Sequence, residues 1–148
     1  MAFIENKKVR FDFEILETLE AGVELLGFEV KAIRKGMGSL EGARVVVRGG
    51  EAFLAGATVS PYQVHNTPKS YSAERTRRLL LNKKELLKLS ENENQKGLTI
   101  VPLKWYNRGR KVKLEIAVAR RKKKYDKRAT LKERDTKRQV ERTLKNQY

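Results

Sequence analysis

Apolar and polar side chains alternate near the start of the chain, from Val9 to Leu16. A period of two is typical of a β-strand with one buried face, so a strand is expected here. Two further regions consist of paired β-rich runs separated by a turn that contains glycine. Each of them predicts an antiparallel hairpin: runs 43–48 and 51–56 around Gly49 and Gly50, and runs 98–106 and 112–120 around residues 107–110.

Two helices are expected between these strands. The first covers Gly27 to Arg34 and ends at Gly36, a residue type that commonly terminates a helix. The second starts at Asn82, whose side chain can cap the helix while Glu85 reaches back toward it. Gly97 stops this second helix.

A long loop and a basic cluster separate the first hairpin from the second helix. Residues 61–74 contain two prolines and several Ser, Thr and Asn residues, which predicts a loop. Directly after it, Arg75, Arg77 and Arg78 precede three leucines at 79–81. We expect a strand or a helix anchored by the leucines, with the guanidinium groups facing solvent.

Short strands that are mostly antiparallel, together with a few capping helices, predict a mainly β fold with peripheral helices. The expected architecture is an OB-fold-like antiparallel β-barrel. Residues 1–119 carry 21 basic and 14 acidic side chains, a net charge of +7, and are expected to form this barrel. Residues 120–148 are expected to form a separate basic C-terminal tail.

The tail holds 13 Lys or Arg residues and four acidic residues, which is +9 of the chain's formal charge of +16. Its few apolar residues are scattered, so it cannot bury a continuous stripe against a core. On a helix its cations would form a ladder suited to phosphates. We therefore predict a segment that becomes helical on a polyanionic partner; the alternative is a solubilising, disordered tail.

The residues offer little for catalysis or for cofactor binding. The chain has no cysteine and a single histidine, His65, which falls in the predicted loop without neighbouring metal donors. No catalytic residue, metal site or cofactor is therefore expected, and the protein is predicted to bind rather than to turn over a substrate. The sequence shows neither a signal peptide nor a long apolar run, so we expect a soluble, cytoplasmic protein without a membrane partner.

A compact β-barrel with excess positive charge is a common platform for oligonucleotides. Such platforms combine charged grooves with exposed aromatic rings that stack on bases. Trp105 and Tyr106 are adjacent on a predicted strand, so one ring must point outward if the other points inward. Core packing is the competing interpretation for either ring.

Motifs along the whole chain resemble those of the SsrA-binding protein (SmpB) family, and their order and spacing agree from end to end. The matching segments are Asn6-Lys7-Lys8, Phe13-Glu14-Ile15, Glu20-Ala21-Gly22, Gly27 to Gly36, Gly50 to Leu54, Arg77 to Asn82, Val101-Pro102-Leu103, Tyr125 to Arg128, and Lys132 to Asp135.

The resemblance implies a factor of trans-translation with an oligonucleotide-binding barrel. In that family the barrel binds the tRNA-like domain of transfer-messenger RNA (tmRNA) and delivers it to stalled ribosomes. The basic tail enters the empty mRNA channel beside small-subunit ribosomal RNA near the decoding centre. A protein of this kind is expected to be a monomer when bound to RNA.

The resemblance also places site residues. Asn6 and Glu20 match positions associated with the tmRNA surface, and Lys31, Arg34 and Leu81 are further candidates. Glu20 is acidic, yet a carboxylate can accept hydrogen bonds from base amino groups. The ribosome-binding tail positions are Tyr125, Asp126, Lys127, Arg128, Lys132, Arg134, Arg138, Arg142 and Lys145.

Two other functions fit part of the pattern. A constitutive ribosomal protein with a β-barrel body and a basic extension fits the composition equally well. An RNA-processing enzyme would need a pair of carboxylates to hold Mg²⁺, and the acidic residues of this sequence form no such cluster. The family resemblance favours the ribosome-rescue factor over both.

Overall fold

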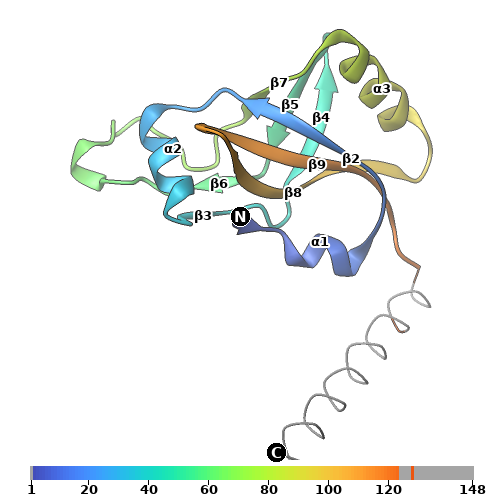
Figure 1. The fold of residues 1–148 in the computed structure, drawn as a ribbon, viewed down its shortest axis with the longest axis horizontal. Coiled ribbons are helices and arrows are strands. Elements are labelled where there is room, and N and C mark those ends of the chain that lie inside the picture. The colour runs from blue at the N-terminus through green and yellow to red at the C-terminus, as the bar shows by residue number, and fades with distance from the viewer. Residues whose placement is uncertain (1, 124–127, 129–148) are drawn as a thin grey trace, which may run out of the picture.

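The computed structural model describes residues 2–123 and residue 128. Its main sheet has seven strands in the order β1-β8-β9-β2-β7-β5-β4, and β3 and β6 form a small second sheet (Figure 1). The strands are β1 (Ala2–Glu5), β2 (Phe13–Val23), β3 (Gly38–Ser39), β4 (Arg44–Arg48), β5 (Glu51–Ala55), β6 (Thr58–Val59), β7 (Arg77–Leu80), β8 (Leu98–Arg108) and β9 (Lys111–Arg121). The helices are α1 (Lys7–Asp12), α2 (Gly27–Arg34), α3 (Lys83–Asn94) and the 3-10 helix η1 (Val64–Asn66).

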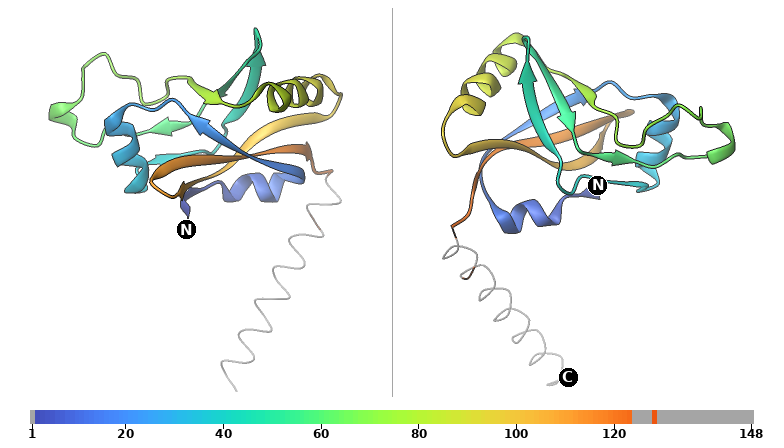
Figure 2. Two further views of the ribbon diagram at one scale, coloured as in Figure 1. Left: turned by 45° about the horizontal axis from the view of Figure 1, so that its top comes forward. Right: turned by 180° about the vertical axis from the view of Figure 1, so that it is seen from behind.

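The main sheet curls until its edge strand β4 contacts β8, and α3 packs beside both strands (Figure 2). Each neighbouring pair of strands is antiparallel. The side chains that point inside form one apolar core, with Trp105 and Ile116 fully buried within it. The predicted fold class, a mainly β antiparallel architecture with peripheral helices, is confirmed.

A second, smaller apolar cluster lies on the outer face of the long strands β2, β8 and β9. There α1 places Val9 against alanines of β9 and two residues of β8. These long strands therefore carry buried side chains on both faces where α1 covers them, and polar side chains where it does not. The cluster consists of Val9, Val101, Leu103, Ala117 and Ala119.

Both predicted hairpins and both predicted helices are confirmed. The second hairpin is tighter than expected, because β8 continues to Arg108 and β9 begins at Lys111. At the start of α3, the Glu85 backbone N–H donates to Asn82 Oδ1 at 2.8 Å. In return, the Asn82 backbone N–H donates to Glu85 Oε1 at 3.1 Å, which completes the predicted capping box. This helix ends at Asn94, before the expected stop at Gly97.

The predicted strand from Val9 to Leu16 is wrong in its first half. Residues 7–12 form α1, and the strand β2 begins only at Phe13. Asn6 caps the helix, because its side-chain Oδ1 accepts a hydrogen bond from the Val9 backbone N–H at 3.4 Å. Val9 and Phe13 are four residues apart and both contribute to the cluster under α1, so four residues of alternation did not distinguish a helix from a strand.

The segment 61–74 is irregular apart from η1, as the sequence predicts. None of the helices in the described part of the chain is long and apolar enough to cross a membrane. The predicted bound-state helix of the tail lies outside the described residues. The predicted boundary after residue 119 stays a prediction, and β9 itself continues through Arg121.

Candidate nucleic-acid interface

Glu20 lies on the uncovered outer face of β2, opposite Glu115 of β9. One of its carboxylate oxygens, Oε2, accepts hydrogen bonds from the Tyr106 hydroxyl at 2.6 Å and from Arg108 Nη1 at 2.9 Å. The hydrogen bond from Tyr106, followed by the positive charge of Arg108, lowers the pKa of Glu20 below its ordinary value despite partial burial. Glu20 is therefore held as an anion at neutral pH.

Tyr106 points outward, while its neighbour Trp105 is fully buried. This arrangement confirms that the two adjacent rings face opposite sides of the sheet. Lys104 Nζ lies 5.6 Å from the centroid of the Tyr106 ring. Burial and the hydrogen bond to Glu20 raise the pKa of the Tyr106 hydroxyl, so it stays protonated and acts as the donor.

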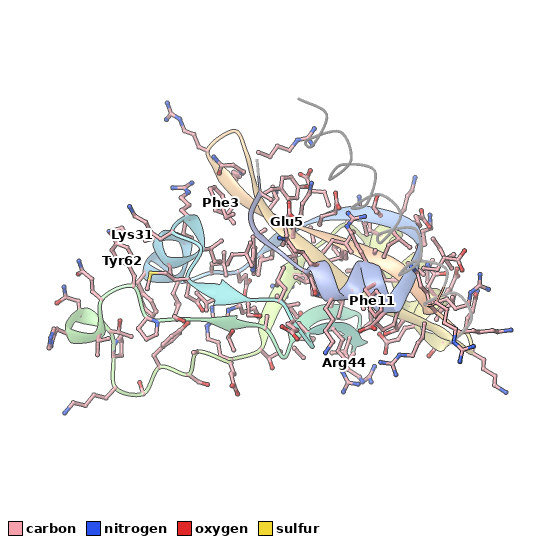
Figure 3. The ribbon with its side chains drawn as sticks, turned by 90° about the horizontal axis from the view of Figure 1, so that it is seen from below. Phe3, Glu5, Phe11, Lys31, Arg44 and Tyr62 are labelled. Atoms are coloured by element: carbon pink, nitrogen blue, oxygen red, sulfur yellow. The ribbon has the colours of Figure 1, made fainter. Side chains whose placement is uncertain are left out.

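Arg34 reaches the same end of the molecule from α2. Its Nη2 donates to the backbone carbonyl of Arg110 at 2.8 Å, in the turn between β8 and β9. Because Arg108 of this hairpin binds Glu20, the structure joins two predicted site residues through one turn. Lys31 is exposed one helical turn before Arg34 and projects outward from α2 (Figure 3).

Among the leucines of the basic segment, Leu80 is the one that reaches the outer surface. It pairs with Gly22 of β2, two residues from Glu20, and its side chain is 49% exposed. A Cβ at Gly22 would lie 3.2 Å from Leu80 Cβ and 3.4 Å from Lys113 Nζ. Leu81, the predicted contact, is partly buried and packs against the core, and its contact with RNA stays a prediction.

Leu80, Lys113 and Tyr106 are therefore interface candidates beyond the residues predicted from the sequence. The alternation along β7 contains the signal for Leu80, since a buried Leu79 requires Leu80 to face outward. No local pattern places Lys113 beside Gly22. We call the group of Glu20, Leu80, Tyr106, Arg108 and Lys113 the outer cluster.

Asn6 lies elsewhere and is almost completely buried, with 3% of its surface exposed. Its Nδ2 donates to the carbonyl oxygens of Leu40 and Pro102, each at 3.0 Å. Together with the capping bond to Val9, these contacts hold α1 and β8 together. The structure thus gives Asn6 a role in packing, and its contact with RNA stays a prediction.

Arg77 corrects the expectation that the guanidinium groups of the basic cluster face solvent. Its side chain is fully buried, and its Nε and Nη2 donate to Glu29 Oε2 at 2.9 Å and 2.7 Å. The next residue, Arg78, faces outward and pairs with Glu24. The reason is the alternation along β7, which turns Arg77 into the barrel where Glu29 of α2 compensates its charge.

Glu29 is the centre of a buried network that ties the end of the 61–74 loop to α2. It also accepts hydrogen bonds from Arg75, and the Tyr71 hydroxyl lies 2.9 Å from its Oε2. Burial alone would raise the pKa of Glu29, but the hydrogen bonds from Arg75, the Leu26 backbone and Arg77 lower it to about 2. We call Glu29, Tyr71, Arg75 and Arg77 the inner cluster.

Of the predicted tail residues, only Arg128 is described, and its side chain is exposed. The others lie outside the described residues: Tyr125, Asp126, Lys127, Lys132, Arg134, Arg138, Arg142 and Lys145. The described chain reaches the tail through Lys122, whose backbone N–H donates to the Asp12 carbonyl at 2.8 Å. The tail therefore starts beside the C-terminal end of α1.

Comparison with known proteins gives matches over nearly the whole chain. The family model described as SmpB protein matches residues 3–146. An SsrA-binding protein of Chlorobaculum tepidum is 46% identical over 146 residues, covering 98% of this chain and 92% of the relative. One from Gloeothece citriformis is 46% identical over 141 residues, covering 95% and 91%. A solved chain described under "tmRNA-SmpB: a journey to the center of the bacterial ribosome" aligns with a TM-score of 0.69 and 41% identity, covering 82% of this chain and 85% of that chain.

Proposed function

The chain belongs to the SmpB family, and from this premise we propose that it is the RNA-binding factor of trans-translation. The barrel binds the tRNA-like domain of tmRNA through the outer cluster and delivers the RNA to stalled ribosomes. The basic tail occupies the empty mRNA channel beside small-subunit ribosomal RNA. The protein works in the cytoplasm as one copy per RNA, by binding alone.

The observation that carries this proposal is the state of the Glu20 carboxylate. Both of its hydrogen bonds use Oε2, and within residues 2–123 and 128 no donor binds Oε1. The Glu20 side chain is partly exposed, so an ionised carboxylate with one oxygen unused by the described donors can accept a hydrogen bond from a base amino group. Such a contact reads bases, whereas the cations around it only attract the backbone.

The surroundings of Glu20 supply the other requirements of an RNA surface. Arg108 and Lys113 both place positive charge near the carboxylate. Tyr106 offers a partly exposed ring and Leu80 an exposed apolar side chain, both suited to contact with bases or riboses. Arg34 and Lys31 extend the positive surface along α2.

Body and tail have separate tasks in this proposal, and a truncation separates them. A chain that ends at Lys123 keeps every described strand and helix, so we expect it to fold and to bind tmRNA. It should fail in peptide tagging on ribosomes programmed with a message that lacks a stop codon. Full tagging by the truncated protein would remove the tail from the mechanism.

The ribosomal-protein alternative is tested by the RNA that copurifies with the protein from cells. A rescue factor should retain tmRNA as the dominant species and should be enriched on stalled ribosomes. A constitutive ribosomal protein should occur at about one copy per ribosome under all conditions. Recovery of bulk ribosomal RNA without enrichment of tmRNA would contradict the proposed function.

A further inference from the structure

A cavity of about 710 Å³ opens at the end of the molecule from which the tail leaves, and the outer cluster does not contribute to it. We propose that this cavity binds one unstacked nucleotide of an RNA partner. Its walls come from α1, the turn before β4, β6, and the ends of β2, β8 and β9 nearest the tail. The proposal rests on the proposed function and adds a second RNA-binding site to it.

The cavity combines an apolar wall with an aromatic surface. Val9, Ala43 and Val101 are each less than 7% exposed and form its apolar part. Phe13 lies at its edge, with the Arg121 guanidinium carbon 5.6 Å from the ring centroid. A guanidinium plane beside a phenyl ring is a surface on which a nucleobase stacks. Sites of this size with a few polar groups commonly hold a single small ligand.

The charges around the cavity favour a nucleotide over a simple anion. Arg44 and Arg121 have no ion-pair partner among the described residues, and Figure 3 shows Arg44 projecting outward at this edge. Lys8 is paired with Glu41 at 3.5 Å, and Glu74 adds a second carboxylate. Asp12 also lines the cavity. A bare phosphate would require an excess of cations, whereas a nucleotide presents both a phosphate and base amino groups that donate to carboxylates.

The position of the cavity connects it with the tail. Phe13 pairs with Arg121 at the last rung of the β2–β9 ladder, whereas Glu20 pairs with Glu115. Seven residues along a strand correspond to roughly 23 Å, so one nucleotide cannot reach both sites. The described part of the tail begins beside Asp12, which lines the cavity, so the cavity lies next to the point where the basic tail leaves the barrel.

Titration of the full-length protein with adenosine and uridine 5′-monophosphates, followed by amide NMR, tests the proposal. We expect saturable shifts at the amides of Gly42 and Gly56 and none at Gly22, which lies beside Leu80 and Lys113 of the outer cluster. Arg121→Gln should weaken this binding about fivefold to tenfold, as loss of one stacked guanidinium predicts. Arg120→Gln is the matched control, since Arg120 carries the same charge on the opposite face of β9 and pairs with Glu14.

Two RNA arms identify the source of the nucleotide. Crosslinking of each variant to the isolated tRNA-like domain and to small ribosomal subunits should show a selective loss for Arg121→Gln in at least one arm. Absence of shifts at Gly42 and Gly56, or equal behaviour of the two variants in both arms, overturns the cavity proposal. If the cavity proposal fails but the wild-type protein still binds tmRNA, the proposed function remains supported. If the wild-type protein does not bind tmRNA, the proposed function is overturned too.

Discussion

The inner and outer clusters contain the same three residue types, a glutamate, a tyrosine and arginine, yet they differ in burial. Glu29 and Arg77 have fully buried side chains. Glu20 keeps 32% of its side chain exposed, and Arg108 keeps 72%. In both clusters the carboxylate accepts from a tyrosine hydroxyl and a guanidinium, so the hydrogen-bond chemistry does not distinguish them. Burial decides which cluster supports the fold and which can contact a ligand.

The two clusters contribute differently to folding stability, because solvent water competes for the hydrogen bonds and ion pairs of the outer cluster only. A buried ion pair is costly to break, since the remaining partner keeps its charge without solvation. An exposed pair contributes little to folding, because solvent screens it and both side chains lose rotamer freedom. The inner cluster therefore fixes α2 and the 61–74 loop relative to the barrel. The outer cluster is a binding surface: its side chains can exchange their present hydrogen bonds for contacts with a ligand with little change in the free energy of unfolding.

The largest expected effect separates the clusters by stability. Glu29→Gln leaves Arg77 buried without a charge partner, and we expect the free energy of unfolding to fall by about 3 to 5 kcal/mol. Glu20→Gln, the matched substitution in the outer cluster, should change it by less than about 1 kcal/mol. Urea unfolding followed by circular dichroism measures both. Equal losses in the two variants would contradict the distinction between a supporting and a binding cluster.

The second-largest expected effect is a loss of folding stability at acid pH, caused by protonation of Glu29 in the inner cluster. The pKa of Glu29 lies at about 2 in the folded protein, against an ordinary value of 4.5, so the unfolded chain binds this proton more tightly. The stabilisation is fully present above pH 4.5 and is lost as the pH falls toward 2, a total of about 3 kcal/mol. Unfolding free energies of the wild type and Glu29→Gln, measured from pH 7 to 2.5, should converge at low pH. Parallel curves would show that Glu29 is not the group responsible.

For RNA affinity, unlike stability, we expect the larger effect from substitutions in the outer cluster. Glu20→Ala removes the proposed base acceptor, and we expect binding to the tRNA-like domain to weaken by about 1 to 3 kcal/mol although a negative charge is lost. Simple electrostatics predicts tighter binding instead. Filter binding at several salt concentrations distinguishes the two, because loss of a base contact leaves the salt dependence unchanged. Tighter or unaltered binding would leave Glu20 a surface residue without a role in recognition.

The smallest effect concerns the orientation of the Glu20 carboxylate. Tyr106→Phe keeps the ring but removes the hydroxyl that donates to Oε2, and we expect a loss of about 0.5 to 1 kcal/mol in RNA affinity. If the hydroxyl acts by holding Glu20, the same substitution should have no effect in a Glu20→Ala background. An additive loss in the double variant would assign the hydroxyl its own contact with RNA. The stability of both variants, measured by thermal unfolding, is the control.

Residues close in sequence determined the elements that were predicted correctly. The Gly49-Gly50 turn, the Asn82 and Glu85 capping box, and the termination of α2 near Gly36 all follow from backbone conformations and hydrogen bonds within a few residues. The motif series likewise identified the family, because the order of motifs is a property of the chain itself. Local pattern failed at residues 9–12, where four alternating residues fit either a helix or a strand.

Tertiary structure alone decided the properties of the clusters. Glu29 and Arg77 are 48 residues apart in sequence, and Glu20 and Tyr106 are 86 apart. Nothing in the local sequence of Arg77 and Arg78 states which guanidinium is buried, because that depends on the strand's partners and on the helix packed across them. The same holds for the cavity beside Phe13, whose lining residues come from segments far apart in the sequence. The sequence by itself determined the family and the local elements, since these depend on the order of residues along the chain and on near neighbours. Burial depends on contacts between distant segments, so the role of each charged side chain is decided only in the folded chain.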